Sequence, residues 1–312
     1  MDFVSRILIL PLLLALSISG RSSGEAPVRV FILAGQSNMV GAGQVKADPE
    51  RHGGQGSLEW LVDSSPERKR YEHLRNEDGS WAAREDVQIW FLGRQGALRP
   101  GFGSNEGTIG PELGFGMVVG DAYDEPVLLI KIAWGGKAIG KEFRPPSSGG
   151  VVGPEYRLLV ENVKKVMADP SALFPELEGR EFELMGIGWH QGWNDRVNQA
   201  FNDAYEENLS NLIRDLRREL GRPELPFVIA ETGMSGARER HPRALSLMAA
   251  QAAVARRPEF EGTVAFVGTR AFYRPPERSP SRQGYHWNSN AETYYLIGQG
   301  MGKAMLGLVE EN

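Results

Sequence analysis

Val28-Arg29-Val30-Phe31-Ile32-Leu33-Ala34 is an apolar run that leads directly into the turn Gly35-Gln36-Ser37-Asn38-Met39. A short run of this kind, rich in β-branched residues, is typical of a buried strand in a parallel sheet. Gly35 lets the backbone turn sharply, so we expect Ser37 at the carboxyl edge of that sheet. Open α/β sheets bind ligands at this edge, and a serine held there can be a nucleophile if a base reaches it. Taken alone, Ser37 is more simply explained as the cap of the next helix.

Similar runs recur along the chain and alternate with helical patterns. Further candidate strands lie at 87–92, 127–134, 184–189 and 227–231, and residues 263–267 would form a sixth. Candidate helices lie at 111–123, 155–167, 200–220, 243–256 and 291–308. This alternation predicts a parallel sheet with helices on both faces. Two polar loops rich in glycine and proline, 46–84 and 143–153, interrupt the pattern and are candidates for shaping a binding cleft.

Composition narrows the class of protein. The 312 residues are 41% hydrophobic and 24% charged, as in an ordinary globular protein. A formal net charge of −5 gives no electrostatic reason to expect nucleic acid as a partner. The absence of cysteine excludes disulfides, thiolate metal sites and a cysteine nucleophile. The five histidines form no close pair, so no metal site is expected; they stand at positions 52, 73, 190, 241 and 286.

The amino terminus has the layout of a secretory signal peptide. Asp2 and Arg6 precede an apolar run over 7–18, which passes into small residues up to position 24. We therefore expect a leader at 1–24, cleaved near 19–24, and one domain at 25–312 in a secreted or periplasmic protein. The alternative is an uncleaved anchor, although the apolar run is short for a membrane span and no later segment is long enough.

A candidate base stands near the other end of the chain. His286 lies in Gln283-Gly284-Tyr285-His286-Trp287-Asn288, just before the last predicted helix. A neutral imidazole there can accept the proton of Ser37 and pass it to a leaving oxygen. The alternative is a histidine that only satisfies the start of the helix.

Two further turns offer hydrogen-bond donors for an oxyanion. Trp134-Gly135-Gly136 follows the third strand, where glycines let a backbone N–H approach a substrate closely. Trp189-His190-Gln191-Gly192-Trp193-Asn194-Asp195 follows the fourth strand and supplies side-chain amides. The tryptophans near these turns and near His286 suit sugar rings, and core packing explains each of them equally well.

Together these motifs resemble the SGNH-hydrolase superfamily, and more specifically its sialic-acid-specific acetylesterase branch, related to the family-six carbohydrate esterases. The resemblance adds Gly110-Pro111-Glu112-Leu113-Gly114 and Ile130-Lys131-Ile132-Ala133 to the motifs above, in the same order along the chain. It implies a flavodoxin-like, three-layer αβα sandwich with a mostly parallel sheet of five or six strands. It also implies a serine esterase that removes O-acetyl groups from carbohydrates through an acyl-enzyme, without a cofactor. Acetylated sialic acid and acetylated plant or algal polysaccharide are the substrates it suggests.

Carried over by position, the resemblance makes Ser37 the nucleophile and His286 the base. The oxyanion hole would use the backbone N–H of Ser37 and that of Gly135 or Gly136. A side-chain amide completes it: the acetylesterase branch favours Gln191, the wider superfamily favours Asn194, and we expect Gln191. The residues expected at the substrate are Gln36, Asn38, Trp134, Trp193 and Trp287.

The chain departs from the pattern beside the histidine. Many relatives have an acid three residues before it, and this chain has Gln283, which cannot carry the charge that stabilises an imidazolium. Gln283, Glu292 and Asp195 are candidates to orient His286, and a backbone carbonyl would leave a Ser–His dyad. Two alternatives stay open: a weak or inactive carbohydrate-binding relative, and an esterase for lipid or simple alkyl esters.

Overall fold

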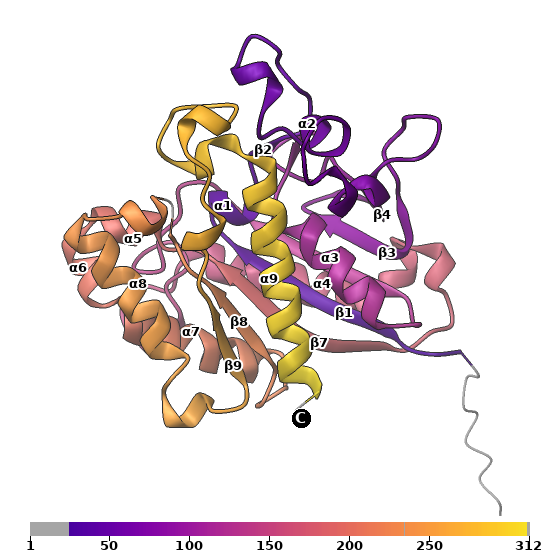
Figure 1. Ribbon diagram of the computed structural model, residues 1–312. Coiled ribbons are helices and arrows are strands. Elements are labelled where there is room, and N and C mark those ends of the chain that lie inside the picture. The colour runs from indigo at the N-terminus through magenta and orange to yellow at the C-terminus, as the bar shows by residue number, and fades with distance from the viewer. Residues whose placement is uncertain (1–24, 234, 311–312) are drawn as a thin grey trace, which may run out of the picture.

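The computed structural model describes residues 25–233 and 235–310. Its centre is a seven-stranded sheet in the order β4-β3-β6-β1-β7-β8-β9 (Figure 1). Every neighbouring pair is parallel except β3 and β4, which are antiparallel. The strands are β1 (Val28–Gly35), β3 (Arg84–Phe91), β4 (Arg94–Leu98), β6 (Val127–Ala133), β7 (Phe182–His190), β8 (Phe227–Ala230) and β9 (Val264–Val267). A separate two-stranded ribbon joins β2 (Gly43–Gln44) to β5 (Thr108–Ile109).

The predicted mostly parallel sheet is confirmed, but the expected five or six strands were too few. The strand missed is β4, which follows β3 through a tight turn at Leu92 and Gly93, both with positive φ (47° and 93°). Its sequence, Arg94-Gln95-Gly96-Ala97-Leu98, has neither the β-branched residues nor the alternation of a typical strand. An edge strand needs only one hydrogen-bonded neighbour, here β3, so pairing outweighs the weak propensity.

Helices cover both faces of the sheet, which gives the predicted three layers. The helices are α1 (Ser37–Val40), α2 (Leu58–Asp63), α3 (Pro111–Ala122), α4 (Pro154–Ala168), α5 (Trp193–Val197), α6 (Gln199–Asp203), α7 (Tyr205–Glu219), α8 (Pro242–Val254) and α9 (Ala291–Glu310). Alternate residues of β1 point to the two faces: Phe31 and Leu33 join the core under α3 and α9, and Val30 and Ile32 join the core under α4, α7 and α8. The single helix expected at 200–220 is interrupted at Ala204, between α6 and α7.

Helix α9 is held close to α3 by paired glycines. A Cβ on Gly114 would lie 2.0 Å from the Tyr295 carbonyl oxygen, and a Cβ on Gly298 would lie 2.0 Å from the Pro111 oxygen. Only glycine permits this approach, and the resulting contact fixes the end of the chain against the sheet (Figure 1). The segment that carries His286 runs directly into α9, so this packing also fixes where that segment lies.

Strand β1 is the topological switch point of the sheet. Its two neighbours are β6 and β7, so the connections on either side of β1 diverge at its carboxyl end. Ligands of open α/β sheets bind in the crevice formed at such a point. Ser37 follows β1, Gly135 and Gly136 follow β6, and Asn194 follows β7. Within 25–233 and 235–310, no helix is both long and apolar enough to cross a membrane.

Candidate active site

Gly35 allows β1 to end where it does and so sets the position of Ser37. Its φ is 153°, and a Cβ there would lie 2.2 Å from the carbonyl oxygen of His190 at the end of β7. Ser37 is the first residue of the four-residue helix α1 and is half-buried. The serine is therefore presented at the carboxyl edge of the sheet, as the sequence predicts.

Gln36 joins the turn after β1 to the turn after β7. It is only 1% exposed, and its Oε1 accepts hydrogen bonds from Gly192 N (3.0 Å), Asn194 N (3.3 Å) and Gln191 Nε2 (3.2 Å). A side chain engaged in this way fixes the spacing of the two turns and leaves little surface for a substrate. We expected Gln36 at the substrate, and the structure gives it a positioning contact instead.

Asn38 is equally buried, with 2% of its surface exposed. Its Oδ1 accepts a hydrogen bond from the Tyr294 hydroxyl at 3.4 Å, which connects α1 to α9. It too was expected at the substrate, and its described contact is with the protein interior.

The main chain at Gly135 and Gly136 runs beside the candidate nucleophile. A Cβ on Gly135 would lie 4.0 Å from the Cβ of Ser37, and both glycines are exposed. The preceding residue, Trp134, donates its N–H to the carbonyl oxygen of Gly35 at 3.3 Å, which ties the two turns together. The turn after β6 is therefore held beside the Ser37 turn.

Gln191 and Asn194 differ in whether the side-chain amide has a hydrogen left to donate to a substrate. Gln191 is fully buried, and its Nε2 donates to Asp195 Oδ2 (2.5 Å) and to the Lys137 carbonyl oxygen (2.9 Å) as well as to Gln36. An amide nitrogen has two hydrogens, so none remains for a substrate. Asn194 is partly exposed, and its Nδ2 donates to the carbonyl oxygen of Gly136, which leaves one hydrogen directed elsewhere. The geometry thus favours Asn194, whereas we expected Gln191.

Asp195 holds the loop after β6 rather than the histidine. Its two carboxylate oxygens accept the N–H groups of Ile139 (2.9 Å) and Gly140 (2.8 Å), besides the amide of Gln191. Burial raises the pKa of Asp195 to about 6, and these donors oppose the rise. Its role is therefore to fasten the Gly135–Gly136 turn to the Asn194 turn.

His286 lies in a left-handed turn that has no glycine in it. Four consecutive residues have positive φ: His286 (48°), Trp287 (49°), Asn288 (53°) and Ser289 (58°). Each such residue costs on the order of 1–2 kcal/mol relative to the right-handed form, and strain of this kind gathers at functional sites. Asn288 holds the turn, because its Oδ1 accepts the Gly284 N–H at 3.0 Å.

Trp287 brings this turn to the edge that carries Ser37. It is fully buried, and its ring stacks on His190 with 6.3 Å between centroids and an interplanar angle of 26°. His190 pairs with Gly35 at the ends of β7 and β1, so the stack places the His286 turn over the ends of these strands. We expected Trp287 at the substrate, and its complete burial assigns it to the core.

The His286 ring is half-buried and edge-on to the Tyr285 ring, with 4.8 Å between centroids. Burial lowers the pKa of His286 below its usual 6.5, which favours the neutral form that a general base needs. Within 25–233 and 235–310, no hydrogen bond joins the ring to the Ser37 hydroxyl. Catalytic hydrogen bonds are often loose until a substrate binds.

Among the described residues, none of the three groups considered for orienting His286 is hydrogen-bonded to its ring. Gln283 is exposed and donates to the Ser289 hydroxyl at 3.4 Å. The Glu292 carboxylate accepts from Arg274 Nε at 2.6 Å and from a tyrosine hydroxyl. Asp195 is engaged in the loop contacts described above. In the described part of the chain, His286 therefore has no hydrogen-bonded acid partner.

A family model matches most of this chain. The model for carbohydrate esterases described as sialic acid-specific acetylesterases matches residues 27–304. The chain belongs to this family. No curated protein sequence matches the chain.

Two solved structures share the fold of this esterase-family chain. A protein from Arabidopsis thaliana is 19% identical, with a TM-score of 0.59 over 90% of this chain and 98% of that one. A carbohydrate acetylesterase from Xanthomonas citri is 14% identical, with a TM-score of 0.56 over 91% of this chain and 56% of that one. At these identities the likeness establishes the fold alone.

Two of the three tryptophans considered for sugar binding keep exposed surface. Trp134 is partly buried and tilts against Phe143, with 6.0 Å between centroids. Trp193 is partly buried, and the Arg196 guanidinium lies 3.7 Å from the centre of its ring. Trp134 directly precedes Gly135 in the chain, and Trp193 directly precedes Asn194, so both are next to candidate oxyanion donors.

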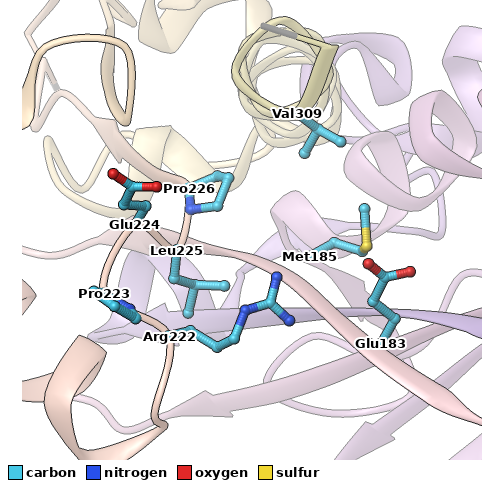
Figure 2. A pocket seen from close by; sticks show the side chains of 8 residues that line it. All are labelled: Glu183, Met185, Arg222, Pro223, Glu224, Leu225, Pro226 and Val309. Atoms are coloured by element: carbon cyan, nitrogen blue, oxygen red, sulfur yellow. The ribbon is translucent and has the colours of Figure 1, made fainter. Parts of the chain in front are cut away.

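One clear hollow in the surface, of about 360 Å³, is far from this chemistry. It is lined by Glu183 and Met185 near the start of β7, by residues 222–226 before β8, and by Val309 at the end of α9 (Figure 2). These are the amino ends of the strands, opposite the edge that carries Ser37. In the part of the chain that the structure describes, no group of three or more acidic or histidine side chains is arranged to hold a metal.

Proposed function

We propose that this chain is an exported carbohydrate O-acetylesterase with Ser37 as its nucleophile and His286 as its base. The observation that carries the proposal is the position of Ser37 at the switch point of the sheet, with the Gly135 main chain beside it. Family membership supports a carbohydrate ester as the substrate class. Family membership does not extend to serine chemistry, export or a particular sugar, and these belong to our proposal.

The reaction begins when the Ser37 oxygen attacks the carbonyl carbon of an acetyl ester and its proton passes to His286. The tetrahedral oxyanion accepts hydrogen bonds from the Ser37 N–H, from a glycine N–H of the 135–136 turn and from Asn194 Nδ2. The protonated imidazole then donates its proton to the sugar oxygen, which leaves as an alcohol. Water attacks the acetyl-enzyme by the same route, and acetate is released.

Two features support this assignment of donors. The Asn194 amide has a hydrogen to spare, whereas the Gln191 amide uses both. Gln36 holds Asn194 at a fixed distance from the Ser37 turn through its backbone N–H. Donors fixed before the reaction stabilise developing charge without reorganising, which makes them effective in catalysis.

The alternative is a relative that binds carbohydrate and has little or no esterase activity. The lack of an acidic partner for His286 favours it, because an imidazolium without a carboxylate is less stable. In a serine protease, replacing the triad acid by its amide lowered turnover about 10⁴-fold. Against this alternative, burial keeps the imidazole neutral and ready to accept a proton.

The test compares the wild-type protein with Ser37→Ala for release of acetate from acetylated xylan, acetylated sialic acid and esters of longer acyl chains. We expect Ser37→Ala to lose about 10³-fold or more of the activity, because the nucleophile is removed. Ser171→Ala, at a serine in the Pro170–Ala172 segment, is the matched control and should keep full activity. Equal rates for wild type and Ser37→Ala would overturn the serine mechanism.

Two further outcomes separate the alternatives. A fluorophosphonate probe that leaves Ser37 unmodified while the protein still binds glycans favours the binding relative. A preference for acyl chains longer than acetyl would remove the carbohydrate acetylesterase assignment. Export is tested separately: the mature protein should be recovered outside the cytoplasm, with a mass that places its new amino terminus between residues 20 and 25 of the sequence.

A further inference from the structure

Lys131 is a fully buried lysine in a central strand of the sheet. It lies on β6, paired in register with Leu33 of β1, and none of its surface is exposed. Its Nζ donates to the carbonyl oxygen of Val40 (2.7 Å), the carbonyl oxygen of Phe102 (2.7 Å) and Glu112 Oε2 (2.6 Å). A protonated amine has three N–H groups, and all three are used here.

One of these acceptors belongs to the helix that carries the candidate nucleophile. Val40 is the last residue of α1, and Ser37 is the first. A helix of four residues has no stability of its own in water, so its position depends on tertiary contacts. The Lys131 ammonium, bound to the Val40 oxygen, is a contact that fixes the carboxyl end of α1.

Glu112 completes the link from the other side. It is fully buried in the first turn of α3, and its second oxygen accepts the N–H of Gly110 at 2.7 Å. Gly110 in turn lies against Gly41, the residue after α1, where a Cβ would come within 2.2 Å of the Gly110 Cα. The ammonium therefore holds the backbone at Val40, and the carboxylate holds the Gly110 backbone that packs against the next residue, Gly41.

Stability alone does not explain this ion pair. Taking two charges out of water is costly, and well-packed apolar residues in place of a buried pair are often neutral or stabilising. The charged pair adds directional contacts, since it holds two backbone oxygens and one backbone N–H at fixed positions. A positional role is thus the better explanation of its cost.

We propose that Lys131 and Glu112 are positioning residues that hold helix α1, and with it the Ser37 hydroxyl, in the arrangement needed for attack. The catalytic part of this inference rests on the proposed function; the structural part does not. Neither side chain touches a substrate. The pair acts through the backbone at the end of α1.

The hold of Lys131 and Glu112 on the end of α1, called the clamp below, depends on the proton of Lys131. Burial lowers the pKa of Lys131 to about 8; Glu112 on α3 raises it and Arg94 on β4 lowers it. A neutral amine has two N–H groups for the same three acceptors, so one contact is lost when the proton leaves. The α1 helix should therefore loosen as the pH rises past the pKa of Lys131, and activity should fall with it.

The first measurement is hydrogen exchange in the wild-type protein, which requires no variant. The amides of Met39, Val40 and Gly41 are hydrogen-bonded within the α1 turn. After correction for intrinsic base catalysis, their protection should fall about tenfold between about pH 7 and pH 9.5, while that of the sheet is unchanged. In Glu112→Gln the fall should occur about 1 pH unit lower or more, because the partner charge that keeps Lys131 protonated is gone.

The second measurement is the pH profile of kcat for acetyl ester hydrolysis. The alkaline limb should follow the exchange midpoint in both proteins, with kcat affected and KM nearly constant. Glu125→Gln is the matched control: it breaks a partly buried ion pair with Arg29 at the amino end of β1 and should leave both midpoints in place. If Glu112→Gln does not fold, the double variant Lys131→Met, Glu112→Leu should keep the urea midpoint yet lose about tenfold in kcat.

The outcomes separate this inference from the proposed function. Unchanged protection of residues 39–41 across the pH range and in the variants overturns the clamp, whatever the activity. If that protection is lost while the alkaline limb of kcat stays in place, the clamp exists but does not control catalysis, and the catalytic part of the inference is overturned. A wild-type protein without esterase activity defeats the proposed function, and the exchange data alone then decide for or against the clamp.

Discussion

Replacing Asn194 with alanine and Gln191 with methionine distinguishes a donor to the oxyanion from a residue that holds the site together. Asn194 is partly exposed and donates to the Gly136 carbonyl oxygen. Loss of that neutral bond should cost about 0.5–1.5 kcal/mol of stability. If Asn194 also donates to the oxyanion, its removal should lower kcat by about 10²–10³-fold, or about 2.7–4 kcal/mol of transition-state stabilisation.

Gln191→Met should have the opposite profile. The substitution removes a bond from a buried amide to the Asp195 carboxylate, worth about 1.5–3 kcal/mol, and a neutral bond to the Lys137 oxygen, worth about 0.5–1.5 kcal/mol. The expected loss is therefore about 2–4.5 kcal/mol in the free energy of unfolding. Activity should fall because the turn is displaced, not because a donor has gone.

The assay pairs urea unfolding, followed by tryptophan fluorescence, with kcat for acetyl ester hydrolysis at about pH 8, where Asp195 is ionised. Asn162→Ala is a suitable control, because this partly exposed asparagine makes a similar bond to the Leu158 oxygen on the distant helix α4. Our reasoning fails if Asn194→Ala keeps wild-type kcat, or if Gln191→Met is as stable as the wild type and still loses kcat by 10²-fold.

Two other predictions concern the turn that carries His286. Burial lowers the pKa of His286, and the neutral ring is the active form. The acid limb of kcat/KM should therefore lie below about pH 6.5, with activity lost as the pH falls through the pKa. A limb above that value contradicts the burial of the ring. At Ser289, with φ 58°, glycine should give a protein about 1 kcal/mol more stable than alanine does, the reverse of the order in a right-handed helix. Urea midpoints of Ser289→Gly and Ser289→Ala check this, and a more stable alanine variant would count against the left-handed turn.

The central parallel strands were predictable because they are buried on both faces. In β1 and β6 nearly every residue is apolar, and a short apolar run of this kind is visible in the sequence alone. The order of the strands was not predictable in the same way: β1 lies between β6 and β7, which come far later in the chain. Strand β4 was missed because its pairing with β3, not its composition, makes it a strand.

The sequence predicted those parts of the candidate site that come directly after a parallel strand. Ser37, Gly135 and Asn194 each stand just past a parallel strand, and such ends meet at one edge of the sheet. The conformation of His286 had no comparable signal, because a left-handed turn is ordinarily marked by glycine and this one is formed by other residues. Its strain is sustained by contacts from distant parts of the chain, such as the stack of Trp287 on His190.

The polar residues inside the site were misjudged for a related reason. Whether Gln36 faces a substrate or the interior depends on partners 156 and 158 positions away, at Gly192 and Asn194, which local sequence does not reveal. Lys131 did carry a usable signal: it interrupts the apolar run Val127–Ala133 of a central strand. A charge in a strand buried on both faces must be paired and hydrogen-bonded, because an unpaired one costs too much. The partner is Glu112, which nothing in the sequence distinguishes among the 40 acidic residues, because the pair forms only when α3 packs against the sheet.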